Sequence, residues 1–509
     1  MIPMLQPYQE PKLSFQDEKV FDSLVPYDHW TRRADQFIDF LKLRESIQSY
    51  FCESGRPAVE PIVLIKMELL MFHQCLSDSQ LIERCKTDLA FRRFLRLGLS
   101  DTLPDVSTLR KFRARIGAEG HSKLFHALLT QARQYGLVKD RLRLKDATHV
   151  LADIAIPAGL QLVAQARNKL LNAAERFERE QVEGERVRIE TIRLSTDGKG
   201  NEERLAARVE HLRDILAWVE KIECSSGKEE NFQWLSLRAA IEIARKVLHG
   251  NDDPKAPKKI RSTVDPDARR GKHGEFYDGY FVDVLVDADS ELFTAINVLA
   301  AGESESADAV LLLAQEQSYH GNQVEKMSID GAGYDGPVIR QLESSNGGAI
   351  ELFIPPRDKT NGGKFTSDEF KLNEDGMSVT CPQGERSRTK QSMPARHTTS
   401  FKFADETCNS CPLKSQCISP DQKNGRTVKK GDYEAEYQKV EERAKTKEYA
   451  NIKREHPKVE RRLGELINRH KGRRARYRGQ PRVLAQKFLE ATAANLIRML
   501  RLLDVNYAI

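Results

Sequence analysis

The sequence predicts an α/β protein with several domains, in which a mixed β-sheet follows a helical domain. Apolar residues recur with helical spacing over 28–136, which predicts a bundle of helices. Apolar and polar residues alternate at 141–157 and again at 275–300, as they do in half-buried strands, and a helical pattern at about 158–250 separates these stretches. A cluster of four cysteines predicts a small further module. With 509 residues, the chain is long enough for about two to four domains.

The composition excludes some classes of protein. No apolar run approaches the roughly 20 residues that a membrane-spanning helix needs, so no membrane partner is expected. The N-terminal stretch MIPMLQPYQEPKLSFQDEK has neither a basic start nor an apolar segment, so we expect no signal peptide. These features predict a cytoplasmic, nucleoid-associated protein whose cysteines are reduced.

The first domain, expected at 20–136, consists of short helices joined by tight polar turns. Ser77 or Asp78 can cap one helix, and Asp105 or Ser107 another. The pattern fits a helix-turn-helix-like bundle that binds DNA. On its last helix, three cations are candidates for phosphate contacts, namely Lys111, Arg113 and Arg115. A plain helical bundle with a basic exposed face is the alternative.

A strand with an unexpected acid follows this domain. In RLRLKDATHVLADIAIP, the residues Leu142, Leu144 and Asp146 share one side of a strand. A carboxylate on an apolar side is costly unless it has a partner, so Asp146 is a candidate functional residue. The long helical pattern that comes next is broken by the loop DGKGNEE, and it predicts a helical insertion at 158–262.

The sheet resumes with an expected hairpin around the turn DADSE, followed by a helix, the strand KMSID, a second helix and the strand AIELFIPP. Asp335 is the candidate N-cap of the second helix, which has Pro337 in its first turn. The strand KMSID ends on a lone carboxylate, Asp330, before a glycine-rich turn. Asp330 either caps this turn or binds a metal ion together with acids from elsewhere in the chain.

The cysteine-rich segment is expected at 376–425. Its spacing is C-x26-C-x2-C-x5-C, formed by Cys381, Cys408, Cys411 and Cys417. Four thiolates complete the tetrahedral coordination of a structural Zn²⁺, which makes a zinc ribbon the preferred interpretation. Two disulfides or free thiols are the alternative, and a reducing cytoplasm disfavours disulfides. An iron–sulfur cluster also uses four cysteines, so it stays open.

The C-terminal part of the chain is strongly basic. From Lys423 to Ile509 it holds 23 Lys and Arg against 11 Asp and Glu, an excess of twelve positive charges, whereas the whole chain carries +6. A basic block of this size indicates a polyanion partner, although a solvated helix face is the alternative. The segment KGRRARYRG suits phosphate contacts, and its arginines are Arg473, Arg474, Arg476 and Arg478.

A third acid lies on a late helix. Val459, Leu463, Leu466 and Ile467 form one apolar stripe, and Glu460 lies beside it, at the boundary between buried and exposed. Read alone, Glu460 also fits a surface acid that pairs with a neighbouring arginine.

The order of these elements links the three acids. A strand with Asp146, a hairpin, a helix, a strand that ends at Asp330, and finally a helix with Glu460 follow the order of an RNase H-like fold. The first and fourth strands of that fold are neighbours, so the acids would meet at one edge of the sheet. Three adjacent carboxylates repel one another unless cations lie between them. Two Mg²⁺ or Mn²⁺ ions about 4 Å apart could activate a water or a 3′-hydroxyl and stabilise the leaving oxygen of a phosphodiester.

The chain resembles the DDE transposases of bacterial insertion sequences, in the branch with an InsH-type N-terminal domain. The stretches that carry the resemblance are PIVLIKMELL, LSDSQLIERC, LPDVSTLRKFRARIG, KDATHVLADIAIP, DPDARRGKHGEFYDGY, SIDGAGYDG, the cysteine segment, VERRLGELINRHKGRRARYRG and AANLIRML. The resemblance implies that Asp146, Asp330 and Glu460 are the catalytic metal ligands. It also implies a catalytic core formed by 137–157 and 263–375 and completed by 445–509.

The resemblance implies cleavage of DNA at the ends of an element and joining of the freed 3′-hydroxyl to target DNA. Synapsis of two ends implies a homodimer or a larger assembly on DNA. Related transposases often carry an arginine four residues before the glutamate and a lysine seven after it, where this chain has His456 and Ile467. The phosphate contacts near the cut are therefore assigned to Arg461, Arg462, Arg473 or Arg474.

Two other classes of function compete with this one. A zinc-containing DNA-binding protein without catalysis, such as a decayed transposase or a repressor, would keep the basic segment and the cysteines but not the acids. All three acidic positions are intact here, which favours the enzyme. An RNA-processing nuclease would use the same acids, and a comparison of RNA and DNA cleavage separates it.

Overall fold

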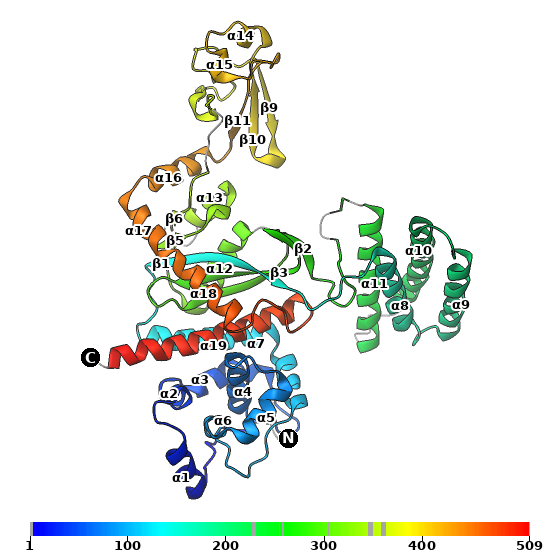
Figure 1. Ribbon diagram of the computed structural model, residues 1–509, viewed down its shortest axis with the longest axis vertical. Coiled ribbons are helices and arrows are strands. Elements are labelled where there is room, and N and C mark those ends of the chain that lie inside the picture. Colours follow the sequence, from blue (N-terminus) through cyan, green and yellow to red (C-terminus); the bar gives the residue numbers. More distant parts are fainter. Residues whose placement is uncertain are drawn as a thin grey trace.

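The computed structural model describes residues 4–225, 231–253, 255–256, 259–303, 305–344, 350–357 and 363–507. A β-sheet with flanking helices lies at the centre, with the helical N-terminal domain below it in Figure 1. The helical insertion lies to one side of the sheet, and the cysteine-rich module stands at the far end of the molecule.

Short helices build the N-terminal domain, as predicted. Their bounds are α1 (Phe15–Leu24), α2 (Trp30–Phe37), α3 (Phe40–Ser46), η1 (Gln48–Tyr50), α4 (Pro61–His73), α5 (Asp78–Thr87), α6 (Leu89–Phe94) and α7 (Val106–Gln134). Ser77 caps α5 in a capping box with Gln80, and Asp105 caps α7, so one predicted residue of each pair is confirmed as the cap. Helix α7 is broken at Gly117, whose φ of 57° is accessible to glycine.

The central sheet is mixed. Its strands are β1 (Leu142–Leu151), β2 (Arg269–His273), β3 (Glu275–Asp287), β4 (Phe293–Ala300), β5 (Lys326–Ser328) and β6 (Glu351–Phe353). They lie in the order β2-β3-β1-β5-β6, and β4 also pairs with β3. β1 is antiparallel to β3 and parallel to β5, which confirms that the strand leading to Asp146 and the strand leading to Asp330 are neighbours. The predicted hairpin is confirmed as β3–β4.

Helices cover both faces of this sheet. One face packs against α12 (Glu305–His320) and α13 (Gly336–Ser344), around buried residues such as Leu285 and Met327. The other face packs against α18 (Pro457–Asn468) and α19 (Gln480–Tyr507), around Leu142 and Leu144. Asp335 accepts a hydrogen bond from the backbone N–H of Val338 at 3.3 Å, which confirms it as the N-cap of α13.

The N-terminal domain is attached to the sheet by α19, which lies against α7 (Figure 1). A buried ion network reinforces this attachment. Glu316 of α12 accepts from Arg143 of β1 at 2.7 Å and from Arg133 of α7 at 2.6 Å. Burial alone would raise the pKa of Glu316, but Arg143 and Arg133 outweigh it and lower this pKa to about 2. The carboxylate is therefore charged and holds both arginines in place.

The helical insertion has its own apolar core, which includes Leu170, Leu212 and Ile241. Its helices are α8 (Gly159–Ala174), α9 (Arg179–Ser195), α10 (Asn201–Ser225) and α11 (Phe232–Asp252). The predicted break at DGKGNEE falls between α9 and α10. Among the described residues, no helix is long and apolar enough to cross a membrane.

The cysteine-rich module contains two small sheets around Phe370, Phe401 and Phe403. Its elements are η4 (Ser367–Glu369), β7 (Lys371–Leu372), β8 (Val379–Thr380), β9 (Thr389–Met393), η5 (Pro394–Arg396), β10 (Thr398–Lys402), α14 (Asp405–Asn409), α15 (Lys414–Cys417) and β11 (Thr427–Gly431). Because β7 pairs with β8, the module begins a few residues before the expected boundary at 376. The chain returns to the sheet through α16 (Glu434–Ala444) and α17 (Lys447–Glu455).

Candidate active site and DNA interface

The register of two parallel strands brings the first two acids together. Leu144 of β1 is the Cα partner of Ser328 of β5. Asp146 and Asp330 each lie two residues beyond this pair, so they lie at the same level on adjacent chains, Asp146 within β1 and Asp330 just after the end of β5. The 3₁₀ turn η2 (Gly331–Gly333) follows Asp330, whose carboxylate accepts the backbone N–H of Ala332 at 3.1 Å. Asp330 therefore caps the turn, as one of its two predicted roles required.

The third acid reaches this edge because of how α18 is anchored. The buried residues Val459 and Leu463 hold α18 against β1, and Glu460, next to Val459, stays exposed. At the start of the helix, the imidazole Nδ1 of His456 lies 3.0 Å from the hydroxyl of Ser328 on β5. Burial lowers the pKa of His456 to about 4, so this side chain is neutral and binds as a hydrogen-bonding group. His456 thus fixes the helix turn that carries Glu460.

The electrostatics of Asp146 report on the proximity of all three acids. Burial, together with the negative charges of Asp330 and Glu460, raises the pKa of Asp146 to about 6. The backbone N–H of Ala147, which donates to the Asp146 carboxylate at 2.8 Å, opposes this shift. The structure therefore brings Asp146, Asp330 and Glu460 within electrostatic reach of one another, in a partly buried site.

Lys453 is a site residue that the sequence analysis missed. It lies in the last turn of α17 and is half-buried. Burial lowers the pKa of Lys453, whereas the carboxylates of Asp330, Glu460 and Asp146 raise it. Its ammonium group is thus the cation that faces the three acids from α17. No pattern in the sequence marks Lys453, and only the packing of α17 shows that it faces the acids.

Across the described residues, no group of three or more His, Cys, Asp or Glu side chains is already arranged around a metal position. The donor types nevertheless fit a divalent cation. Carboxylate oxygens are the ligands that Mg²⁺ and Mn²⁺ prefer, and the raised pKa of Asp146 reflects an excess of negative charge that such a cation relieves.

The four clustered cysteines line a single cavity of about 210 Å³ in the cysteine-rich module. All four are free thiols in this structure. Burial raises the pKa of Cys408, as do the neighbouring Cys381 and Cys411, while the backbone N–H of Arg426 donates to its sulfur at 3.3 Å and opposes the shift. Cys381, Cys408, Cys411 and Cys417 thus lie around one cavity, although the described side chains are not arranged around a metal position there.

The arginines after α18 run along the strand that bears Asp146. The backbone of Arg473 accepts from Leu151 at 2.8 Å, and its guanidinium donates to the carbonyl of His149 at 2.6 Å. Arg474 next to it is exposed. Arg478 is exposed and pairs with Asp153 at 3.2 Å.

Other predicted DNA contacts are engaged inside the protein. Arg113 is buried, at 3.1 Å from Glu68, and also pairs with Asp78. Arg462, on the buried side of α18, pairs with Glu465 and lies over the ring of Phe293. Arg476 donates to the carbonyl of Leu76 at 2.7 Å.

The remaining predicted cations are exposed, namely Lys111, Arg115 and Arg461. A cavity of about 630 Å³ between α7 and the basic segment contains four arginines, Arg110, Arg113, Arg476 and Arg482. The N-terminal domain and the basic segment thus share one positively charged recess.

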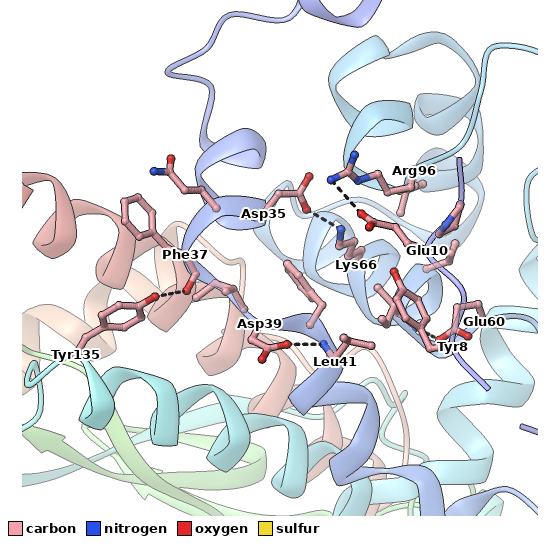
Figure 2. A pocket seen from close by; sticks show the side chains of 17 residues that line it. Tyr8, Glu10, Asp35, Phe37, Asp39, Leu41, Glu60, Lys66, Arg96 and Tyr135 are labelled. Carbon is pink, nitrogen blue, oxygen red and sulfur yellow. Dashed lines mark hydrogen bonds and ion pairs between the residues drawn. The ribbon is translucent and has the colours of Figure 1, made fainter. Parts of the chain in front are cut away.

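A further cavity, of about 390 Å³, lies inside the N-terminal domain (Figure 2). Buried Lys66 donates to Asp35 at 2.6 Å and to the carbonyl of Phe94 at 2.9 Å. Arg96 pairs with Glu10 of the N-terminal arm at 3.5 Å. Lys66 and Arg96 are thus each paired with an acid that also lines this cavity, and the Arg96–Glu10 pair holds the N-terminal arm against the domain. The cavity contains none of the three acids.

Two family models match the chain. Residues 19–115 match the transposase domain DUF772, which covers the N-terminal domain up to the first part of α7. Residues 380–500 match a transposase DDE domain, which covers the four cysteines, Glu460 and the basic segment. Comparison with curated proteins and with solved structures gave no significant match.

The two transposase domains that these models describe define an enzyme that acts on nucleic acid. The two matches specify its kind: the chain is a DDE transposase of the insertion sequences, a polynucleotidyl transferase whose partner is DNA.

Proposed function

We propose that Asp146, Asp330 and Glu460 form the active site of this transposase, within an RNase H-like core. The observation that carries the proposal is the shared register of Asp146 and Asp330 beyond the Leu144–Ser328 pair. The mutual effect of the three carboxylates on the pKa of Asp146 supports the same assignment. The strand order, with β1 between β3 and β5, supports the RNase H-like interpretation.

The three carboxylates would hold divalent cations, Mg²⁺ or Mn²⁺. When bound, such ions polarise the phosphodiester and activate the attacking hydroxyl. The protein's own residues position this chemistry. His456 fixes the start of α18 on β5, the turn after Asp330 orients its carboxylate, and Lys453 neutralises part of the acidic charge.

The proposed substrate is the DNA at the two ends of the element, followed by target DNA. Arg474 and Arg478 are exposed beside the strand of Asp146, which suits contacts to phosphates near the cut. Lys111 and Arg115 on α7 extend the same proposal to the N-terminal domain. Two ends must be held together for transfer, so we infer a homodimer or a larger assembly on DNA.

The cysteine-rich module would be a zinc ribbon. Cys381, Cys408, Cys411 and Cys417 line one cavity and would complete a closed tetrahedral site, which has a structural rather than a catalytic role.

A cleavage assay tests the proposed active site. Purified protein is incubated with Mg²⁺ or Mn²⁺ and a DNA fragment that carries the inverted repeats flanking the reading frame. We expect strand cleavage by the unchanged protein and by the control Asp197→Asn, an exposed acid in the helical insertion. Asp330→Asn and Glu460→Gln should lose at least a hundredfold in cleavage rate, with DNA binding retained.

Cleavage that survives Asp330→Asn would refute the assigned acids. DNA binding without cleavage in any divalent cation would instead favour a non-catalytic DNA-binding protein, such as a repressor.

A further inference from the structure

A second basic site lies at the edge of the sheet, outside the segments that match known transposase domains. A cavity of about 400 Å³ opens where the start of β2 meets the end of β4. Five cations contribute to its wall against one acid: Lys255, Lys259, Arg261, Arg269 and Arg270, with Glu303. The carboxylate of Glu303 accepts the backbone N–H of Ala300 at 3.2 Å, so it is partly engaged by the protein itself. Arg261 pairs with Asp278 at 2.6 Å, and the cavity still has an excess of positive charge, as an anion-binding site requires.

Glycines make this corner of the sheet possible. Gly279 of β3 pairs with Leu151 of β1 on one side and with Arg269 of β2 on the other. A Cβ at Gly279 would lie 2.0 Å from the carbonyl oxygen of Val150, so only glycine allows the strands to approach so closely. β2 then continues past the end of β1 as a two-stranded hairpin with β3.

An exposed aromatic side chain lies on this hairpin between two cations. Phe276 is 64% exposed. The guanidinium of Arg270 lies 4.8 Å from the centre of its ring, and the ammonium of Lys272 lies 5.8 Å away. An exposed ring flanked by cations can contact a sugar or a base edge of DNA while the cations contact the phosphate backbone.

The register shows that this aromatic side chain shares a face with the proposed active site. Val284 is the partner of Asp146, and even-numbered residues of β3 from Phe276 to Val284 lie on one face of the strand. Gly279, beside the cavity, is five residues from Val284, about 17 Å along a strand and about five nucleotide steps in B-DNA, and Phe276 is eight residues away, about 27 Å and about eight steps.

The basic segment connects the two sites. Its last residues bind the loop before β2, because Gly479 donates to Asp265 at 3.2 Å and Gln480 donates to Asp267 at 3.0 Å. The exposed side chains of Arg474 and Arg478 therefore lie along the chain between the acids and the hairpin. Arg474 and Arg478 thus provide positive charge between the strand that bears Asp146 and the cavity.

We propose that the cavity and the β2–β3 hairpin bind the DNA duplex beside the cleaved phosphodiester. A backbone phosphate occupies the cavity, and Phe276 contacts a base or sugar of the same duplex. The proposal rests on the proposed function only in that the ligand is the DNA being cleaved, and it adds a contact about five or more nucleotides from the cut.

Equilibrium binding of the full-length protein to the end duplex, without divalent cations, tests this contact apart from catalysis. The variant Arg270→Gln/Lys272→Gln removes two exposed cations, and Phe276→Ala removes the ring. The matched control is Arg193→Gln/Lys199→Gln, which removes two exposed cations from the helical insertion. Melting temperatures establish that all variants fold.

We expect about tenfold weaker binding for Arg270→Gln/Lys272→Gln, with the slope of log K against log salt smaller by about 2. Phe276→Ala should weaken binding about tenfold with the slope unchanged, because an apolar contact to a sugar or base releases no counterions. The control should bind like the unchanged protein. Affinities and slopes that match the control in both hairpin variants would overturn the proposal.

Photo-crosslinking provides a second measurement that does not depend on affinity. A photoreactive amino acid at position 276 should crosslink to the end duplex about five or more nucleotides from the cut, whereas the same group at the exposed Leu194 of the insertion should not. Absence of a crosslink at 276 would overturn the contact. If Asp330→Asn still cleaved DNA while position 276 crosslinked, the proposed acids would fail and the hairpin contact would stand.

Discussion

The backbone of Arg474 forms a parallel bridge with Leu151, at the end of the strand that bears Asp146. The basic segment is therefore built onto the catalytic strand rather than attached as a mobile tail. Its two consecutive arginines differ in what they contact. Arg473 is half-buried and donates to the carbonyl of His149, whereas the side chain of Arg474 is exposed.

This difference gives a matched pair of substitutions. Arg474→Ala should lower DNA affinity severalfold and reduce the salt dependence by about one phosphate contact, with an unchanged melting temperature. Arg473→Ala should lower the melting temperature, because the carbonyl of His149 loses its donor. Binding titrations at several salt concentrations and thermal unfolding measure the two effects. An unchanged affinity for Arg474→Ala would remove this residue from the DNA interface.

The charge of Lys453 should be visible in the response to metal ions. In EDTA, Lys453→Met leaves the three carboxylates without their internal cation, and Lys447→Met, at an exposed lysine on the same helix, is the control. Addition of Mg²⁺ should then stabilise Lys453→Met more than the unchanged protein. Lys453→Arg keeps the charge and should behave like the unchanged protein. Equal Mg²⁺ responses in all four proteins would contradict this role.

Asp146 gives the metal-free protein a defined dependence on pH. Its pKa is raised to about 6 in the folded state, mainly by burial and then by Asp330 and Glu460. A carboxyl group with a raised pKa binds its proton more tightly when folded, so its stabilising contribution is present below about pH 4 and is lost as the pH rises through about 6.

Asp146→Asn should therefore be more stable than the unchanged protein at pH 8 in EDTA, by on the order of 2 kcal/mol, with no difference near pH 4. Mg²⁺ should stabilise the unchanged protein and leave Asp146→Asn nearly unaffected. Denaturant unfolding at pH 4, 6 and 8 measures this, with Asp197→Asn as the exposed control. If the free energies of unfolding of Asp146→Asn and the unchanged protein differed by the same amount at all three pH values, the folded protein would not raise the pKa of Asp146.

Patterns within single elements predicted much of this structure. Alternation placed Asp146 on the buried side of β1, and the apolar stripe with Val459 and Leu463 placed Glu460 at the edge of α18. These features depend on residues close in the chain, whose periodicity is fixed by strand and helix geometry.

Contacts between distant elements could not be predicted in this way. Arg113 is on a helix whose pattern was recognised, but its partner Glu68 comes from another helix and takes it out of solvent. Strand β2 escaped the analysis because RRGKH has neither apolar alternation nor β-branched residues, and it forms only because Gly271 fits beside Tyr277 and Ala301. Lys453 points to the acids only through the packing of α17 on α18 and β6.

The cysteine cavity leads to a prediction about metal content. If Cys381, Cys408, Cys411 and Cys417 bind one structural zinc ion, the purified protein should contain about one zinc per chain and no iron. Cys408→Ser should lose this zinc, since three thiolates leave the site open, and proteolysis should then cut the module around β9–β11 while the central sheet stays protected, because the module has a separate apolar core. Cys52→Ser, at an exposed cysteine outside the module, is the control and should keep both zinc and protection. Full zinc content in Cys408→Ser would exclude this thiolate as a ligand, and iron in place of zinc would identify the module as a cluster-binding one.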